Sequence, residues 1–174
     1  AIMGIELRQR LGGYLVTGDI VLMRILQAMG DVNGAMDVLH ITEKFKQTYP
    51  FQMGTTLDYK TARVVQCLAL GDVETANHWA EACIGGTELE QLVLARLYLA
   101  QDKAADAQRL LNPQRIHAET GGRTGRLIEI LGLLAIAQNM QGQTDEAVAL
   151  LSHALSLARP EGYMRVFLDM GSPL

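Results

Sequence analysis

Aromatic residues are scarce in this chain. They make up 5% of its 174 residues, although apolar residues of all kinds make up 49%. Leucine and alanine supply most of that apolar content, and both are strong helix formers with little bulk. The composition favours helices that pack closely on one another and disfavours a β-sandwich, whose strands need β-branched and aromatic residues.

Positive charge is also limited. The net charge is −4, and no block of consecutive Lys or Arg occurs. A domain that binds nucleic acid usually carries a basic face, so we expect no direct contact between this segment and DNA. A Gly-x-x-x-x-Gly-Lys-Ser/Thr phosphate loop is missing too, so no nucleotide cofactor is expected in this segment.

Cysteine and long apolar runs are equally sparse. Two cysteines, Cys67 and Cys83, fit reduced core residues better than a disulfide scaffold. No apolar run reaches the ~18 residues of a membrane span, and no signal peptide opens the chain. We therefore expect a soluble cytoplasmic protein without membrane contact. His40, His78, His117 and His153 are scattered, so neither a metal site nor a catalytic group is predicted.

One short phrase recurs four times. It spans Gly30–Ala35, Gly71–Ala76, the degraded copy Asp102–Ala107, and Gly142–Ala147. Glycine after an apolar stretch ends a helix in a left-handed conformation, and Asp or Thr just beyond it can cap the next helix. Each copy therefore predicts the turn of a helix hairpin.

These turns predict an all-α fold, a right-handed α-solenoid of antiparallel helix hairpins like tetratricopeptide repeats. We expect one domain over residues 1–174, with four pairs plus flanking helices. The pairs are expected at about 13–29 with 31–47, 55–70 with 72–84, 87–101 with 103–111, and 125–141 with 144–158. The third pair should stop at Asn112-Pro113, and the loop 112–124 should be the longest connection. A short helix should follow at about 160–169.

The first and second helices of the pairs differ in pattern. Residues 127–137 are apolar almost all round, which predicts a helix enclosed by neighbours. The second helices are more amphipathic, so the first helices should form an inner, concave layer. The chain begins and ends on apolar helices without capping repeats. It should therefore belong to something longer, or bury its ends against another copy.

Three stretches resemble a known family. Gly122–Leu131 resembles the "GRTRSLIEIL" segment of the MalT-type, ATP-dependent regulators of the LuxR class, and Ala158–Asp169 resembles their "AEPEGYVRxFLDEG" ending. Asn77–Glu81 is similar to their "ARWAE". The resemblance implies a helical-repeat sensor that lies between a nucleotide-binding module and a helix-turn-helix module. Neither of those modules is in this chain, so contact with DNA would run only through a helix-turn-helix domain outside it.

The concave layer is the surface where we expect a ligand. Polar residues predicted to project from the first helices could hold a small polar inducer or an extended peptide. They are Thr17, Arg24, Gln27, Asp58, Thr61, Arg96, Glu129 and Asn139. Arg24 and Arg96 each stand six residues before a turn residue, which would place both guanidinium groups in one groove. The alternative is that each arginine pairs with a neighbouring acid, Asp58 or Glu129, and ties adjacent repeats together.

Aromatic residues allow two interpretations as well. Trp79 could stack on a sugar, but packing between repeats is the more usual role for such a residue. Tyr163 and Phe167 should dock the terminal helix onto the fourth pair or onto a partner.

Two functions are therefore open. The chain is either the non-catalytic effector-sensing and self-associating segment of a LuxR-class transcription regulator, or a tetratricopeptide scaffold for protein partners that is unrelated to transcription. The ending at 158–169 favours the regulator.

Overall fold

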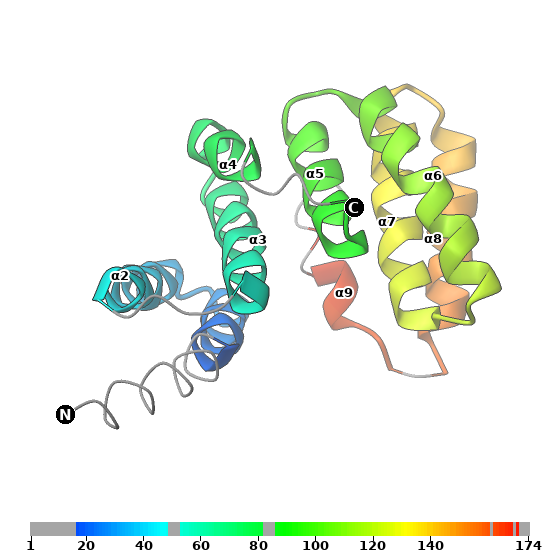
Figure 1. The fold of residues 1–174 in the computed structure, drawn as a ribbon. Coiled ribbons are helices and arrows are strands. Elements are labelled where there is room, and N and C mark those ends of the chain that lie inside the picture. Colours follow the sequence, from blue (N-terminus) through cyan, green and yellow to red (C-terminus); the bar gives the residue numbers. More distant parts are fainter. Residues whose placement is uncertain (1–16, 49–52, 82–85, 161, 169, 171–174) are drawn as a thin grey trace. The chain divides into compact units, whose positions relative to one another are not determined.

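The computed structural model describes residues 17–48, 53–81, 86–160, 162–168 and 170, with side chains except at 46, 53–58 and 168. All regular elements in these ranges are helical, as predicted. A helix over residues 17–28 (helix 17–28) comes first. It is followed by α2 (Val32–Thr48), α3 (Met53–Ala69), α4 (Val73–Ala80), α5 (Glu88–Ala100), α6 (Ala104–Thr120), α7 (Thr124–Met140), α8 (Thr144–Ala158) and α9 (Arg165–Leu168) (Figure 1). None of the described helices is long and apolar enough to cross a membrane.

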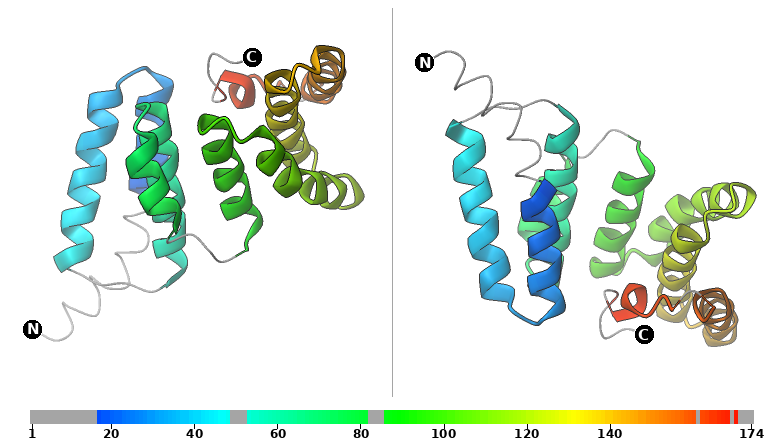
Figure 2. Two further views of the ribbon diagram at one scale, coloured as in Figure 1. Left: turned by 90° about the horizontal axis from the view of Figure 1, so that it is seen from above. Right: turned by 90° about the horizontal axis from the view of Figure 1, so that it is seen from below.

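The chain divides into two compact units, Ala1–Ile84 and Gly85–Leu174. Helix 17–28 with α2, and α3 with α4, form the hairpins of the first unit. The pair α5 with α6, and the pair α7 with α8, form those of the second unit (Figures 1 and 2). These are the four expected pairs, with α9 as a flanking helix.

The recurring phrase forms the predicted turns. Gly30, Gly71, Asp102 and Gly142 all have positive φ, between 59° and 77°. After each, the next N–H bonds to a carbonyl five residues back, as from Asp31 to Leu26 at 2.9 Å and from Lys103 to Tyr98 at 2.8 Å. This is the Schellman motif, which satisfies the last carbonyls of a helix. Asp102 adopts the conformation without being glycine, as aspartate can.

The predicted loop at 112–124 is wrong. Helix α6 continues through Pro113 to Thr120. Proline costs the helix one hydrogen bond, but Leu111 and Ala118 lie two turns apart on one face and both are 0% exposed in the core. Burial of that face keeps the helix intact across the proline. The true end is a fifth turn of the same kind at Gly122, where the Arg123 N–H bonds to the Ala118 carbonyl at 2.9 Å.

Helix α7 is the centre of the second unit. It contacts α5, α6, α8 and α9, and every residue from Leu127 to Ala137 is buried except Glu129, which is half-buried. The prediction that 127–137 is enclosed on several sides is confirmed. Helices α5 and α7 touch each other, so the first helices of these two pairs form one layer.

The terminal segment lies on α7. Helix α9 begins at Arg165, later than the expected 160, because Gly162 closes α8 with the same Schellman bond, from the Tyr163 N–H to the Ala158 carbonyl. The Tyr163 hydroxyl lies over Gly125, 3.3 Å from where a Cβ would stand. Phe167 packs against the core. The expected docking onto the fourth pair is confirmed, although Tyr163 precedes the helix.

The first unit has a core around Met23, Leu39 and Tyr59. Cys67 is buried and free, as expected, and its burial raises the pKa of the thiol. Cys83 lies outside the described residues. Trp79 is half-buried on α4, with the Arg63 guanidinium carbon 4.0 Å from its ring centroid. That contact agrees with a packing role between helices.

Candidate functional site

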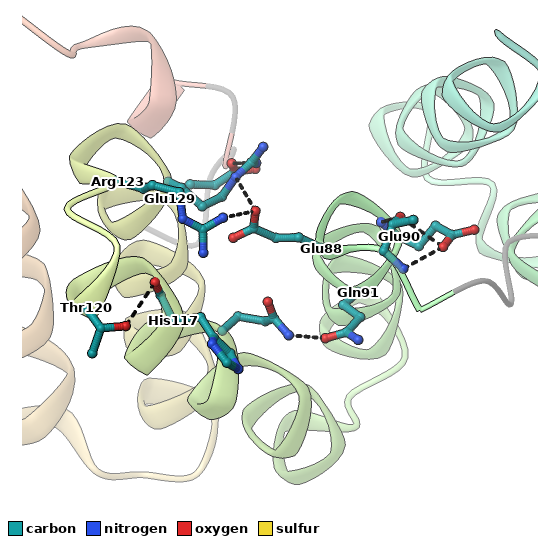
Figure 3. Close-up of polar contacts among 10 residues, drawn as sticks. Glu88, Glu90, Gln91, His117, Thr120, Arg123 and Glu129 are labelled. Atoms are coloured by element: carbon teal, nitrogen blue, oxygen red, sulfur yellow. Dashed lines mark hydrogen bonds and ion pairs between the residues drawn. The ribbon is translucent and has the colours of Figure 1, made fainter. Parts of the chain in front are cut away.

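A cluster of charged side chains in the second unit joins α5 to α7. Arg96 of α5 pairs with Glu129 of α7 at 3.1 Å. The second carboxylate oxygen of Glu129 accepts from Arg126, one turn earlier, at 2.6 Å. Glu88 at the start of α5 pairs with Arg123 and lies 3.9 Å from Nε of Arg126. We call these five residues the α5–α7 ion network. Figure 3 shows Glu88 pointing from α5 toward Arg123.

A capping box fixes the start of α5 beside this network. The Thr87 hydroxyl accepts from the Glu90 N–H at 3.3 Å, and the Glu90 carboxylate accepts from the Thr87 N–H at 2.9 Å (Figure 3). Glu90 is 1% exposed, and these bonds account for a carboxylate at that depth. The box therefore holds the first turn of α5, and Glu88 with it, in place.

The positive charges at the start of α7 explain the role of the two glutamates in the network. Arg123 and Arg126 lie at the amino end of α7, where the helix dipole is unfavourable to cations. Glu88 and Glu129 offset that repulsion. The Arg96 and Glu129 side chains are only 18% and 22% exposed, so solvent screens this pair less than an open surface pair. The arrangement offsets most of the positive charge at the start of α7 and holds α5 and α7 together.

Polar side chains also join the two hairpins of the first unit. The Gln27 amide donates to the Oε1 of Gln66 on α3, and Gln66 is 0% exposed. Thr61 of α3 is buried as well, at 3%. Arg63 pairs with Glu43 of α2 at 2.7 Å. Two residues predicted to project into a groove are thus withdrawn from solvent: Gln27 is half-buried at its contact with Gln66, and Thr61 is buried.

The remaining predicted groove residues divide into two groups. Arg96 and Glu129 form the ion pair that the alternative interpretation named, one that ties neighbouring pairs together. Thr17, Arg24 and Asn139 are exposed. The Asp58 side chain lies outside the described residues. Arg24 and Arg96 belong to different units, so their common groove stays a prediction.

Sequence reasoning missed several members of these contacts. Glu88, Arg123, Arg63 and Gln66 were not among the predicted site residues. Arg123 lies in the stretch Gly122–Leu131, so the resemblance was a usable signal for it. Its partner Glu88 is 35 residues away, and no helical spacing reveals such a pair.

The described part of the chain does not bring together the ligands of a metal centre. It has no group of three or more His, Cys, Asp or Glu side chains that could hold a metal ion. The four histidines are all exposed and lie on four different helices.

The two stretches that carry most of the resemblance meet in space. Arg123, Arg126 and Glu129 belong to Gly122–Leu131, and all three take part in the α5–α7 ion network. The second stretch reaches back to the first where Tyr163 covers Gly125. The stretch Ala158–Asp169 therefore packs on the stretch Gly122–Leu131.

Comparison with known proteins agrees with this geometry. The family model described as "MalT-like TPR region" matches residues 3–174. No curated protein and no solved structure gives a match. Because the family match spans nearly the whole sequence, this chain belongs to the MalT-like TPR region family.

Proposed function

We propose that the chain is the effector-sensing and self-associating segment of a LuxR-class bacterial transcription regulator that acts in the cytoplasm. The observation that carries the proposal is the match to the MalT-like TPR region, reinforced by the packing of the two motif stretches on each other. Helical repeats build extended surfaces for ligands and partners. Binding of an inducer or a protein partner would bias assembly of the regulator, whose DNA contact lies in another module.

The role is non-catalytic. Tetratricopeptide-like repeats typically serve as binding scaffolds, and the polar clusters at the helix contacts contain no nucleophile with an activating base. The chain should therefore show no rise in melting temperature with ATP. A clear rise would contradict the proposal that nucleotide chemistry belongs to a separate module.

Arg24 is the best residue for testing inducer binding. It is exposed on helix 17–28, whereas Arg96 is engaged with Glu129. A guanidinium group suits a carboxylate, a phosphate or a hydroxylated ligand. We expect Arg24→Ala to lower the inducer response of the full-length regulator in a transcription reporter, with no change in the melting temperature of the chain. Arg96→Ala should instead lower the melting temperature.

Arg109→Ala is the matched control, because Arg109 is an exposed arginine on α6 that pairs with Asp106, one turn earlier on the same helix. It should leave both readouts unchanged. If Arg24→Ala behaves like this control, the inducer does not use helix 17–28. If the full-length gene encodes neither a phosphate loop nor a helix-turn-helix module, the scaffold interpretation replaces the regulator.

A further inference from the structure

Two glycines of α7 contact the terminal segment. A Cβ at Gly132 would stand against Sδ and Cε of Met170, with Cε 2.6 Å away, and a Cβ at Gly125 would lie 3.3 Å from the Tyr163 hydroxyl. Positions seven residues apart lie two turns from each other on one face of a helix. The described residues 163–168 and 170, which we call the strap, therefore lie along this glycine face, with α9 against α7 (Figures 1 and 2).

The strap accounts for a glycine in the middle of α7. Gly132 stands halfway along the helix, where glycine is less favourable than any residue except proline. Helix α5, the other first helix of this unit, contains no glycine. Because the end of the Met170 side chain lies where a Cβ would stand, a larger residue at 132 would push the strap outward. The missing side chain is therefore what allows the strap to lie so close to the backbone of α7.

The strap has little regular structure of its own. Helix α9 has four residues, far below the ~12–15 residues at which an isolated helix becomes marginally stable. The N–H groups of Met164, Phe167 and Met170 bond to carbonyls two or three residues earlier, so these bonds are local. The attachment of the strap to α7 therefore depends on its side chains.

Few of those side chains are deeply buried. Met170 is 8% exposed, whereas Tyr163 and Met164 are 40% and 74% exposed. Val166 and Phe167 pack against the core but stay half-buried. A segment with few buried apolar contacts opens at a lower free energy than the core that it covers. The strap should therefore leave α7 more readily than α7 itself unfolds.

The rest of the second unit can stay intact when the strap leaves. The end of α8 is already closed by the bond from the Tyr163 N–H to the Ala158 carbonyl, with Gly162 at a φ of 68° between them. The α5–α7 ion network joins α5 to α7 and uses no residue of the strap. Release of the strap beyond Tyr163 therefore breaks neither the end of α8 nor the network.

We propose that the strap leaves the glycine face of α7 as one unit while α5–α8 stay folded, so that the second unit has a docked and a released state. Ile128 lies three residues after Gly125 and four before Gly132, on the same face, and is 0% exposed. Release uncovers part of this apolar face, and docking closes it. A ligand or partner that prefers one state would shift the balance between them. The device does not rest on the proposed function, and its test uses neither inducer nor transcription.

The test is hydrogen–deuterium exchange of the full 174-residue chain, read at the Phe167 and Met170 amides and along α7. In the unchanged chain the strap should exchange faster than α7, and low denaturant should speed exchange in α7 but not in the strap. Gly132→Ala should speed exchange in the strap by about tenfold or more, because the added methyl group displaces Met170, and should leave α7 protected. Gly18→Ala is the matched control, since a Cβ there meets nothing within 4 Å; it should change neither rate.

Met170→Ala tests whether the effect runs through this contact. Alone it should also speed exchange in the strap, because it removes the most deeply buried side chain. Combined with Gly132→Ala it should exchange no faster than Met170→Ala alone, since the added methyl group then has no Sδ to meet. The proposal is overturned if the strap and α7 of the unchanged chain exchange at one rate. It is also overturned if Gly132→Ala leaves the strap unchanged or speeds exchange in α7 as much as in the strap.

Discussion

The two units bury different kinds of side chain. The core of the second unit around α7 consists of apolar residues, with Ile128, Ile130 and Leu131 all 0% exposed. The carboxylate that this unit buries, Glu90, belongs to the capping box of α5. The first unit buries Thr42 and Gln66, both 0% exposed, beside a smaller apolar cluster. The apolar core tolerates sliding of one helix on another, whereas each buried polar group must keep a particular partner. Close packing of apolar side chains is thus the main stabilising contribution in the second unit, whereas the first unit depends more on specific hydrogen bonds between buried polar side chains.

The largest expected effect is truncation of the enclosed core. Leu131→Ala should destabilise the second unit by about 2–5 kcal/mol, because α7 is surrounded and the cavity cannot close. Leu39→Ala in the first unit should cost less, since its neighbour helix 17–28 has an open side and can shift inward. Denaturant unfolding of both variants, followed by hydrogen exchange of each unit, measures the difference. Equal losses would show that the two cores resist collapse equally.

For polar contacts between helices, we expect the larger loss of stability in the first unit, which is the reverse of the order expected for the two cores. Gln27→Ala removes a partner of Gln66, which is fully buried, and should cost about 1–3 kcal/mol. Arg96→Ala should cost about 1 kcal/mol or less, because Glu129 keeps Arg126 as a partner and both side chains reach solvent. Thermal unfolding at two salt concentrations checks this, with salt dependence expected only for the contribution of Arg96. A larger loss for Arg96→Ala would mean that the α5–α7 ion network is the stronger tie.

Substitutions at the turn residues should change the stability less than these. Asp102 has φ of 59°, in the region where a side chain is strained and glycine is not. Asp102→Gly should therefore stabilise the α5–α6 hairpin, by at most about 1 kcal/mol. The reverse change at an equivalent turn, Gly142→Ala, should destabilise by about 1 kcal/mol. Melting temperatures of the two single variants test the pair, and a loss of stability in Asp102→Gly would contradict the expected strain.

The smallest effect is a pH dependence in the first unit. The bonds from Thr75 to Asp72, which caps α4, lower the pKa of Asp72. A carboxylate with a lowered pKa stabilises the fold above its unfolded value of about 3.9, and that contribution is lost as the pH falls through the folded value. Asp72→Asn should therefore flatten the acid limb of the stability profile, as followed by circular dichroism. An unchanged acid limb would show that the cap contributes nothing through its charge.

The sequence predicted the turns because each is a local signal: one residue that tolerates positive φ, followed by a helix start. The predicted end of the helix at Pro113 was wrong, because proline disfavours a helix locally whereas the burial of Leu111 and Ala118 favours it. That burial depends on helices distant in the sequence, so the local pattern did not reveal it. The candidate site was less accessible to prediction. The pairing of Arg96 with Glu129 was one of two open alternatives, and the pairing of Glu88 with Arg123 depends on the register between α5 and α7.

The Schellman turns also bear on how quickly the chain folds. From α5 to α8 every helix contacts the next one along the chain, across a connection of three residues. Most contacts in that region therefore join segments close in sequence, and closing them costs little chain entropy. Proteins with such local topology fold in microseconds to milliseconds. The second unit should therefore nucleate at any one hairpin and grow from it in either direction.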